Sequence, residues 1–220
     1  MATLEAFDLY RFFHARESET LALRGVSLRL NEGELVALVG PSGSGKSTLL
    51  ACLSGLDEPD GGYVEFLGER LTRRSEAERA RRRGANIGIL MQSRNLFPSL
   101  SVADNIKLAM LIAGKINDER AKNLLAGVGL EERAAARPGQ LSGGELARAG
   151  LAVALAAAPR ILLADEPTGE VDAVTERSIL DILNEQCRAG VAVLVATHSQ
   201  ALAARADRII HLRDGRIGDA

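Results

Sequence analysis

The sequence predicts an α/β domain whose core is a parallel sheet. Three features lead to this prediction. Short apolar runs without polar alternation recur along the chain, which is typical of strands buried on both faces. Stretches with helical patterning separate these runs, and strands that alternate with helices form parallel sheets. The first such run, at 35–39, ends directly in a glycine-rich turn that leads into a helical segment.

Length and composition are those of one soluble globular domain. The chain has 220 residues, and its formal net charge of −2 gives no general attraction to nucleic acid or anionic membranes. The two cysteines, Cys52 and Cys187, are too few for a disulfide framework, so we expect free thiols in a reducing compartment. Because the chain shows neither a signal-peptide pattern nor an apolar run of about eighteen residues, we expect a cytoplasmic protein.

The N-terminal part predicts a small, largely antiparallel sheet laid on the core. Apolar and polar residues alternate in 3–13 and 21–30, as in strands with one buried face. A turn at 31–34 leads into the core strand at 35–39. A further strand is predicted at 63–67, after a turn that contains proline and glycine.

A phosphate-binding loop is predicted at 40–48, where the sequence matches the pattern G-x-x-x-x-G-K-[ST]. The backbone N–H groups of such a loop and the positive end of the next helix form a concavity that suits a phosphate chain. Lys46 is expected to reach the β- and γ-phosphates, and Ser47 to coordinate Mg²⁺. The alternative is a tight strand–helix turn with an incidental lysine and serine, but the flanking strand and helix favour a nucleoside triphosphate site. Its candidate residues are Gly40, Ser42, Gly43, Ser44, Gly45, Lys46, Ser47 and Thr48.

The middle of the chain predicts a charged helix, a second core strand and a helical insertion. Residues 70–83 are rich in arginine; a solvated helix is the ordinary interpretation, and an anion-binding patch is the alternative. Residues 87–91 indicate the second core strand. Residues 99–136 indicate helices, the first with an N-cap at Ser101.

The C-terminal part continues the alternation of strands and helices. A turn is predicted at Asp214-Gly215 after the last strand. The predicted strands are 161–164, 191–196 and 208–213, and the predicted helices are 173–187 and 200–206.

Two acids follow the apolar run at 161–164. A buried strand that ends in Asp165 and Glu166 is costly unless the acids face a cation or a polar site, and ligands bind at the carboxyl ends of parallel strands. Because neighbouring strand residues point apart, we expect Asp165 to hold Mg²⁺ and Glu166 to polarise the attacking water as general base. The alternative is a pair of acids that open a surface turn with Pro167 and Gly169.

A second helix N-terminus suited to an anion is predicted at Leu141-Ser142-Gly143-Gly144-Glu145. It precedes an alanine- and leucine-rich helix that runs to about Ala157. A serine with two glycines most often forms an ordinary N-cap turn, so this motif indicates an anion site only in combination with the other motifs.

Gln92 and His198 each follow a predicted core strand. Alone, a glutamine or a histidine in such a place is more often structural than functional. Together with Lys46 and Asp165 they converge on one edge of the sheet, and this convergence supports a functional role for all four.

The motifs, in this order, resemble those of the nucleotide-binding subunit of ATP-binding cassette (ABC) transporters, over essentially the whole chain. Phe13 falls where this family has an aromatic residue that stacks on adenine, although Tyr10 and Phe12 are close. The other segments that carry the resemblance are the phosphate loop at 40–48, the Q-loop glutamine Gln92, the signature at 141–145, the Walker B acids Asp165 and Glu166, the D-loop at 171–172 and the switch histidine His198.

The resemblance implies a P-loop NTPase (RecA-like) parallel core with an N-terminal antiparallel β subdomain and an inserted α-helical subdomain. A single ABC ATPase domain would span 1–220, with the β subdomain and core at about 1–92 and 159–220 and the helical subdomain at about 93–158. The resemblance also implies ATP and Mg²⁺ as cofactors, a homodimer with ATP between one phosphate loop and the other signature, and separate transmembrane permease subunits. The chain is then expected on the inner face of the cell membrane, bound through its permease, without nucleic acid.

The resemblance further implies roles for single residues. Glu166, His198 and Gln92 are expected to serve catalysis, and Ser47, Gln92 and Asp165 to serve the metal. Nucleotide contacts are expected from Phe13, the phosphate loop, Ser142, Gly143, Gly144, Glu145 and Asp172.

The sequence departs from the family pattern at a few positions. Glu145 stands where many members have Gln, Ser199 where Asp often follows the histidine, Val153 where Arg is frequent, and Phe13 where Tyr is more frequent. None of these is the phosphate-loop lysine, a Walker B acid or the switch histidine, so ATP hydrolysis is expected to be intact.

Several segments resemble one branch, which includes lipoprotein-release, macrolide-export and cell-division ATPases: 87–92, 95–98, 164–169 and 213–217. A soluble ABC ATPase acting on DNA or ribosomes is the alternative function. It is disfavoured because no long coiled coil separates Lys46 from Ser142 and the chain holds one cassette. A signalling GTPase or small-molecule kinase is disfavoured because no N-K-x-D motif is present and a kinase does not need the signature.

Overall fold

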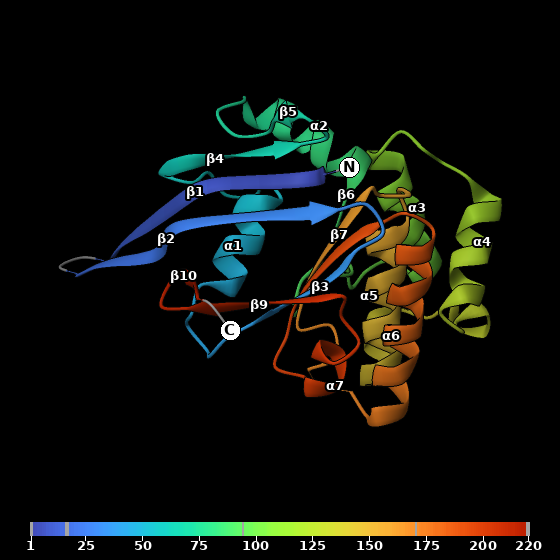
Figure 1. The fold of residues 1–220 in the computed structure, drawn as a ribbon. Coiled ribbons are helices and arrows are strands. Elements are labelled where there is room, and N and C mark those ends of the chain that lie inside the picture. The colour runs from blue at the N-terminus through green and yellow to red at the C-terminus, as the bar shows by residue number, and fades with distance from the viewer. Residues whose placement is uncertain (1, 16–17, 94, 170, 219–220) are drawn as a thin grey trace.

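The computed structural model describes residues 2–15, 18–93, 95–169 and 171–218, which form two sheets flanked by helices (Figure 1). The antiparallel sheet has the order β2-β1-β4-β5, and the second sheet has the order β10-β9-β3-β8-β7-β6. The strands are β1 (Ala2–Ala15), β2 (Ser18–Asn31), β3 (Leu35–Val39), β4 (Gly61–Phe66), β5 (Glu69–Arg70), β6 (Ile87–Leu90), β7 (Ile161–Asp165), β8 (Ala192–Ala196), β9 (Arg208–Arg213) and β10 (Arg216–Gly218). The helices are α1 (Lys46–Leu53), α2 (Glu76–Asn86), α3 (Val102–Ile112), α4 (Asp118–Gly127), α5 (Gly143–Leu155), α6 (Ala173–Arg188) and α7 (Gln200–Ala203), with 3₁₀ turns at Glu131–Arg133 and Pro138–Gln140.

The second sheet contains the predicted parallel core. Strands β6, β7, β8, β3 and β9 all run in the same direction. In register, Leu38 of β3 is level with Ala196 of β8 and Ile210 of β9, and Asp165 of β7 is also level with Ala196. The carboxyl ends of these strands therefore lie side by side, at the edge where such sheets bind ligands.

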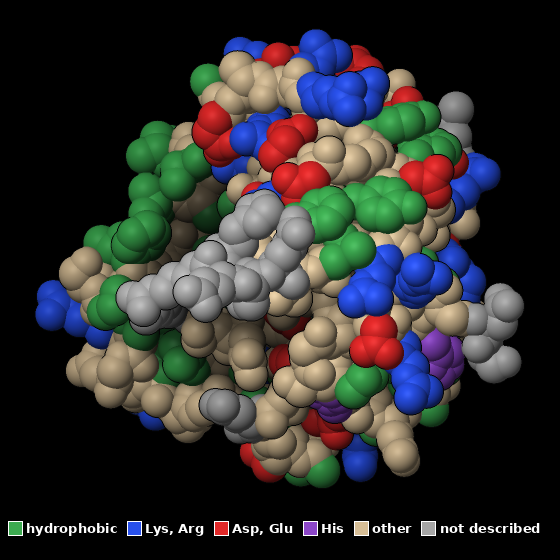
Figure 2. All heavy atoms as spheres, turned by 90° about the vertical axis from the view of Figure 1, so that its left-hand side faces the viewer, with side chains coloured by type: hydrophobic (Ala, Val, Ile, Leu, Met, Phe, Trp, Pro, Cys, Tyr) green, Lys and Arg blue, Asp and Glu red, His purple; other side chains and the backbone are tan. Residues whose placement is uncertain are grey.

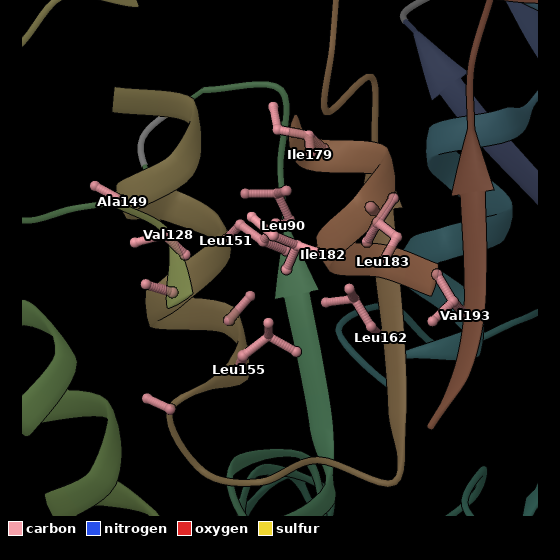
Figure 3. Close-up of a cluster of buried hydrophobic side chains, with 14 of the residues drawn as sticks. Leu90, Val128, Ala149, Leu151, Leu155, Leu162, Ile179, Ile182, Leu183 and Val193 are labelled. Carbon is pink, nitrogen blue, oxygen red and sulfur yellow. The ribbon is translucent and has the colours of Figure 1, made fainter. Parts of the chain in front are cut away.

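Alternate residues of the parallel strands pack into two separate cores, one on each face of the sheet. Leu35 and Ala37 of β3 belong to the core shared with α3, α4, α5 and α6, whereas Val36 and Leu38 belong to the core shared with α1 and the antiparallel sheet. Figure 1 shows the same division, with these four helices on one side of the sheet and α1 on the other. In Figure 3, side chains of α5 and α6 meet those of the sheet in the first core: Leu151, Leu155, Ile179, Ile182 and Leu183 lie against Leu90, Leu162 and Val193.

The N-terminal strands form the predicted antiparallel sheet. The long strands β1 and β2 pair along most of their length, and β1 pairs with β4 on its other side. Leu4, Leu9 and Val26 are buried, as the alternation predicts. The two-residue strand β5 and the three-residue strand β10 were not predicted, because strands this short leave no periodic pattern in the sequence.

The arginine-rich segment forms a helix, α2, that begins at Glu76 rather than at residue 70 because Ser75 provides its N-cap. Its arginines pair with nearby carboxylates: Arg79 with Glu58 and Glu76, and Arg82 with Glu69 and Glu78. Figure 2 shows basic and acidic side chains next to each other at the top of the molecule, where α2 lies. These pairings support the interpretation as a solvated helix over an anion-binding patch.

Both inserted helices begin at a capping side chain, of which the one at Ser101 was predicted. The Ser101 hydroxyl accepts from the Asp104 N–H at 3.1 Å and starts α3, and Asn117 caps α4 in the same way. The predicted helix at 200–206 is shorter in the structure, since α7 ends at Ala203. None of the helices in the described part of the chain combines the length and apolarity that crossing a membrane requires.

Both cysteines are free, as predicted. Burial raises the pKa of the Cys52 thiol to about 12 and that of the Cys187 thiol to about 11. The thiolate is the reactive form of cysteine, so these side chains serve packing rather than chemistry.

Candidate functional site

The phosphate loop joins β3 to α1 in a conformation that only glycine tolerates at two points. A Cβ on Gly40 would lie 2.0 Å from the Leu212 carbonyl oxygen. Gly45 has a φ of +105°, and a Cβ there would lie 2.6 Å from the Ala22 carbonyl oxygen. The loop is thus held closely against β2 and β9. This packing leaves the helix N-terminus at Lys46 facing the edge of the sheet.

Lys46 is buried at the base of this loop, with 7% of its surface exposed. Its ammonium nitrogen lies 2.8 Å from the Gly40 carbonyl oxygen and 3.2 Å from that of Pro41, and donates to both. It also lies 3.3 Å from His198 Nε2. Nearby, the Ser44 hydroxyl is buried without a hydrogen-bond partner among the described residues. A buried cation at this place favours a ligand with several acceptor oxygens.

Glu166 follows the end of β7 in an unusual backbone conformation. Its φ is +49°, a region that costs energy for a residue with a side chain, and its N–H donates to the Ala196 carbonyl oxygen at 2.9 Å. The Glu166 Oε2 atom accepts from the backbone N–H of His198 at 3.2 Å, and Oε1 lies 3.4 Å from His198 Nε2. Oε1 is buried and has no hydrogen bond within the described ranges. One carboxylate oxygen therefore accepts a backbone hydrogen bond, and the other lies beside the His198 ring.

A cavity of about 690 Å³ collects most of the predicted site. It brings together residues from both sheets and from the phosphate loop. Two predicted residues of the loop, Gly40 and Ser44, do not line it. The predicted residues that line it are Phe13, Ser42, Gly43, Gly45, Lys46, Ser47, Thr48, Gln92, Asp165, Glu166 and His198.

The cavity also has walls that were not predicted as part of the site. Arg24 of β2 and Asp214-Gly215 of the β9–β10 turn also line it. The Gly215 N–H donates to the Ser44 carbonyl oxygen at 3.0 Å, so this turn holds the phosphate loop. The sequence signals only a turn at Asp214-Gly215, and nothing in it places that turn beside residue 44.

Phe13 stands at the mouth of the cavity, backed by an arginine. The Arg11 guanidinium carbon lies 5.0 Å from the centre of the Phe13 ring. Arg11 is itself held by Asp57, at 2.8 and 2.9 Å, and by Asp60, at 3.0 Å. Burial by itself lowers the pKa of Arg11, but the hydrogen bonds and charges of the two aspartates outweigh it, so that the pKa is raised.

The predicted signature lies outside this cavity, at the N-terminus of α5. Ser142 and Glu145 form a capping box: the Ser142 hydroxyl accepts from the Glu145 N–H at 3.2 Å, and Glu145 Oε2 accepts from the Ser142 N–H at 2.8 Å. The hydrogen bond from the Ser142 backbone lowers the pKa of Glu145, and Arg133 lowers it further. Gly143 lines a separate groove of about 280 Å³ that Gln92 and Glu166 also border. The signature and the phosphate loop are thus not joined into one pocket within the described part of this chain.

Asp172 is likewise outside the large cavity, as the N-cap of α6. Its carboxylate accepts from the backbone N–H groups of Val174 and Thr175, both at 2.9 Å, and from the Thr175 hydroxyl. Hydrogen bonds from the backbone and side chain of Thr175 lower the pKa of Asp172. The observed contacts of Asp172 are those of a helix cap.

The residues that line the cavity suit a magnesium–nucleotide complex. No group of three histidine, cysteine or acidic side chains suited to a metal occurs among the residues described by the structure. Mg²⁺ differs from transition metals in that it needs only one or two protein oxygens besides water and phosphate. Asp165 and Ser47 both line the cavity and offer oxygen ligands of this kind.

Comparison with known proteins identifies the family. A model of the ABC transporter family matches residues 23–169, which is more than half of the chain. The chain belongs to the ABC transporter family. It is an ABC ATPase subunit, and the alternative of a soluble ABC ATPase acting on DNA or ribosomes finds no support in its relatives.

This ABC ATPase is similar in sequence to several curated proteins. It is 45% identical to the lipoprotein-releasing system ATP-binding protein LolD of Roseobacter denitrificans, over 98% of this chain and 97% of that protein. It is 41% identical to LolD of Acinetobacter baylyi, over 96% and 95% of the two chains. It is 42% identical to an uncharacterized ABC transporter ATP-binding protein of Thermotoga maritima, over 97% and 93%. The predicted branch is thereby confirmed.

The ABC ATPase also superposes on solved cassettes. The dimeric post-hydrolysis state of the ATP-binding cassette MJ0796, bound to ADP and Pi, matches with a TM-score of 0.93 and 33% identity over 98% of this chain and 97% of that one. A second dimeric structure, of MJ0796 as a bacterial ABC transporter cassette, matches with a TM-score of 0.92 and 35% identity over the same shares of the two chains. These matches confirm the predicted P-loop NTPase fold with its parallel core and antiparallel sheet.

Proposed function

We propose that this chain is the Mg²⁺-dependent ATPase of a lipoprotein-releasing membrane complex and that ATP drives two copies of it together. The observation that carries the proposal is the meeting of Lys46, Glu166 and His198 in one cavity, with contacts of 3.3 and 3.4 Å to the histidine. Similarity to the LolD proteins of two bacteria supports the lipoprotein-releasing role.

The phosphate loop binds the triphosphate, and Lys46 carries the positive charge for its β- and γ-phosphates. The Lys46 ammonium donates to two loop carbonyls in the structure, and phosphate oxygens are stronger acceptors than these carbonyls. Ser47, Asp165 and Gln92 would hold Mg²⁺, which would neutralise part of the phosphate charge. Phe13 stacks on the adenine at the mouth of the cavity.

Glu166 acts as general base for the attacking water. The His198 backbone N–H donates to its Oε2 atom at 3.2 Å and holds the carboxylate at the wall of the cavity, where it accepts the proton of the water. His198 Nε2 lies within 3.4 Å of both Glu166 and Lys46, so it orients the base next to the γ-phosphate position. Hydrolysis then depends on the backbone that places His198.

A second copy of the chain completes the site. Ser142, Gly143, Gly144 and Glu145 lie outside the nucleotide cavity of their own chain, and we assign them and Asp172 to the ATP of the partner. The dimeric MJ0796 cassettes support this arrangement. In this proposal residues 93–158 act as a helical subdomain on a body made of 1–92 and 159–220. The dimer binds separate permease subunits at the inner face of the membrane, and no nucleic acid takes part.

The decisive test is Glu166→Gln. We expect phosphate release at saturating Mg-ATP to fall about a hundredfold or more, because the base is lost. ATP binding should persist, and an ATP-dependent dimer should accumulate on size exclusion. Glu132→Gln is the control, since Glu132 is exposed and remote from the cavity. Undiminished hydrolysis by Glu166→Gln would overturn the assignment of the base, and absence of the dimer would overturn ATP-driven closure.

A further inference from the structure

Ser199 and Glu176 form a short hydrogen bond next to the nucleotide cavity. The Ser199 hydroxyl donates to Glu176 Oε1 at 2.5 Å and accepts from the Leu202 N–H at 3.1 Å. Both residues are half-buried. A hydroxyl whose donor and acceptor are both engaged has one orientation, and a hydrogen bond to a carboxylate is among the stronger kinds.

This bond anchors the residue that follows His198. On the other side of His198, Thr197 is fully buried, and its N–H donates to the Leu38 carbonyl oxygen of β3 at 3.0 Å. The Ser199 N–H closes the turn by donating to the Thr197 hydroxyl oxygen at 2.9 Å. His198 is thus held between a residue tied to the parallel sheet and a residue tied to α6. Its backbone N–H is the donor that engages Glu166.

Glu176 belongs to the first turns of α6, which also contact the signature. Thr175 is buried, and its hydroxyl donates to Asp172 at 3.1 Å. A Cβ added to Gly144 would lie 2.7 Å from the Thr175 hydroxyl oxygen, so α5 and α6 approach each other closely at this point. One short stretch of α6 therefore touches the signature through Thr175 and the His198 loop through Glu176.

We infer that Ser199 and Glu176 are a positioning pair that sets the His198 N–H against Glu166 and mechanically links the catalytic loop to the signature end of α5. The inference rests on the proposed roles of Glu166 and His198. If α5 moves in this chain, the displacement acts first on Thr175, and the neighbouring Glu176 transmits it to Ser199. Neither residue of the pair lines the nucleotide cavity; the pair acts through the backbone of His198.

The test is a set of four variants with steady-state ATPase kinetics. Ser199→Ala removes the donor, and we expect kcat to fall about tenfold with little change in KM, as for the loss of one hydrogen bond to a charged group. Ser199→Thr keeps the hydroxyl and should retain most of the activity. Ser199→Asp places a carboxylate against Glu176 and should lower kcat further. Adding Glu176→Gln to Ser199→Asp restores a donor–acceptor pair with reversed polarity and should recover kcat.

Ser75→Ala is the matched control, because Ser75 also caps a helix with its hydroxyl but lies on α2, away from the cavity. It should leave kcat unchanged. If Ser199→Ala behaves like Ser75→Ala, or if Glu176→Gln fails to rescue Ser199→Asp, the positioning pair is refuted. Wild type and Glu166→Gln are assayed in parallel. An inactive wild type or an active Glu166→Gln refutes the proposed function itself. If both behave as expected but Glu176→Gln does not rescue Ser199→Asp, only the positioning pair is refuted.

Discussion

The chain presents two helix N-termini that suit phosphate, and they are built differently. At α1, the N-cap is Gly45, no side chain caps the helix in the described part of the chain, and a buried lysine stands at the first helical position. At α5, Ser142 and Glu145 satisfy each other in a capping box, and Ser142 and Gly143 are exposed. The first terminus is left unsatisfied inside a cavity, and the second is already stable and faces outward.

From this difference we infer that the two termini would bind phosphate under different conditions. An uncapped helix end beside a buried cation gains most when an anion enters, because burial strengthens the attraction. At α5 the capping box satisfies the Ser142 and Glu145 N–H groups and leaves those of Gly143 and Gly144. This exposed helix end is therefore stable without a bound phosphate. We therefore expect α1 to bind nucleotide in a single chain and α5 to contribute only when a second chain arrives.

Lys46→Met tests whether the buried lysine at α1 binds phosphate. We expect nucleotide affinity of the isolated chain to fall about a hundredfold, because charge-assisted bonds to phosphate are lost from a buried site. Binding of a fluorescent ATP analogue in the presence of Mg²⁺ measures the change. Lys115→Met is the matched control, because Lys115 also donates to two backbone carbonyls, of Ala85 and Ala157, but lies outside the cavity. Equal losses in both variants would show that the lysine matters for the fold rather than for the phosphate.

The α5 terminus is tested by comparing Ser142→Asp with Ser142→Asn. Aspartate and asparagine are both good N-caps, so both variants should fold normally. Aspartate adds a negative charge where the partner's phosphate would lie, and we expect its ATPase rate to fall more than about tenfold while the asparagine variant keeps most of its activity. Nucleotide binding to the monomer should be equal in the two. If Ser142→Asp impaired monomer binding as strongly as hydrolysis, α5 would act within its own chain and the contrast with α1 would disappear.

Sequence patterns predicted those features of the two helix termini that depend only on residues close together in the chain. The glycine spacing at 40–48 and the serine and glutamate at 142 and 145 specify their turns within a few residues, and the apolar runs specify the parallel strands that end beside them. Three features depend on residues that only the fold brings together: Arg11 with Asp57, Ser199 with Glu176, and Gly215 with Ser44. Such polar pairs leave no periodic signal. The arginine-rich helix shows the same limit, since its composition predicts a charged surface but not which glutamates neutralise it.

A third, smaller effect concerns the cavity at α1 alone, because Phe13, the residue proposed to stack on the base, lines it. Arg11 lies against Phe13 and is held by Asp57 and Asp60, so the ring is backed on one side by a fixed cation.

Methionine has a side chain of similar length without charge. In Arg11→Met we expect ATP affinity to fall about threefold, the size of one partly exposed cation–π contact. Affinity for inorganic tripolyphosphate should not change, because that ligand has no base to stack. A comparable loss for both ligands would mean that Arg11 supports the phosphate loop through the aspartates instead of the ring. The ratio of the two affinities therefore separates recognition of the base from recognition of the phosphates, and we expect only the α1 site to show such a ratio.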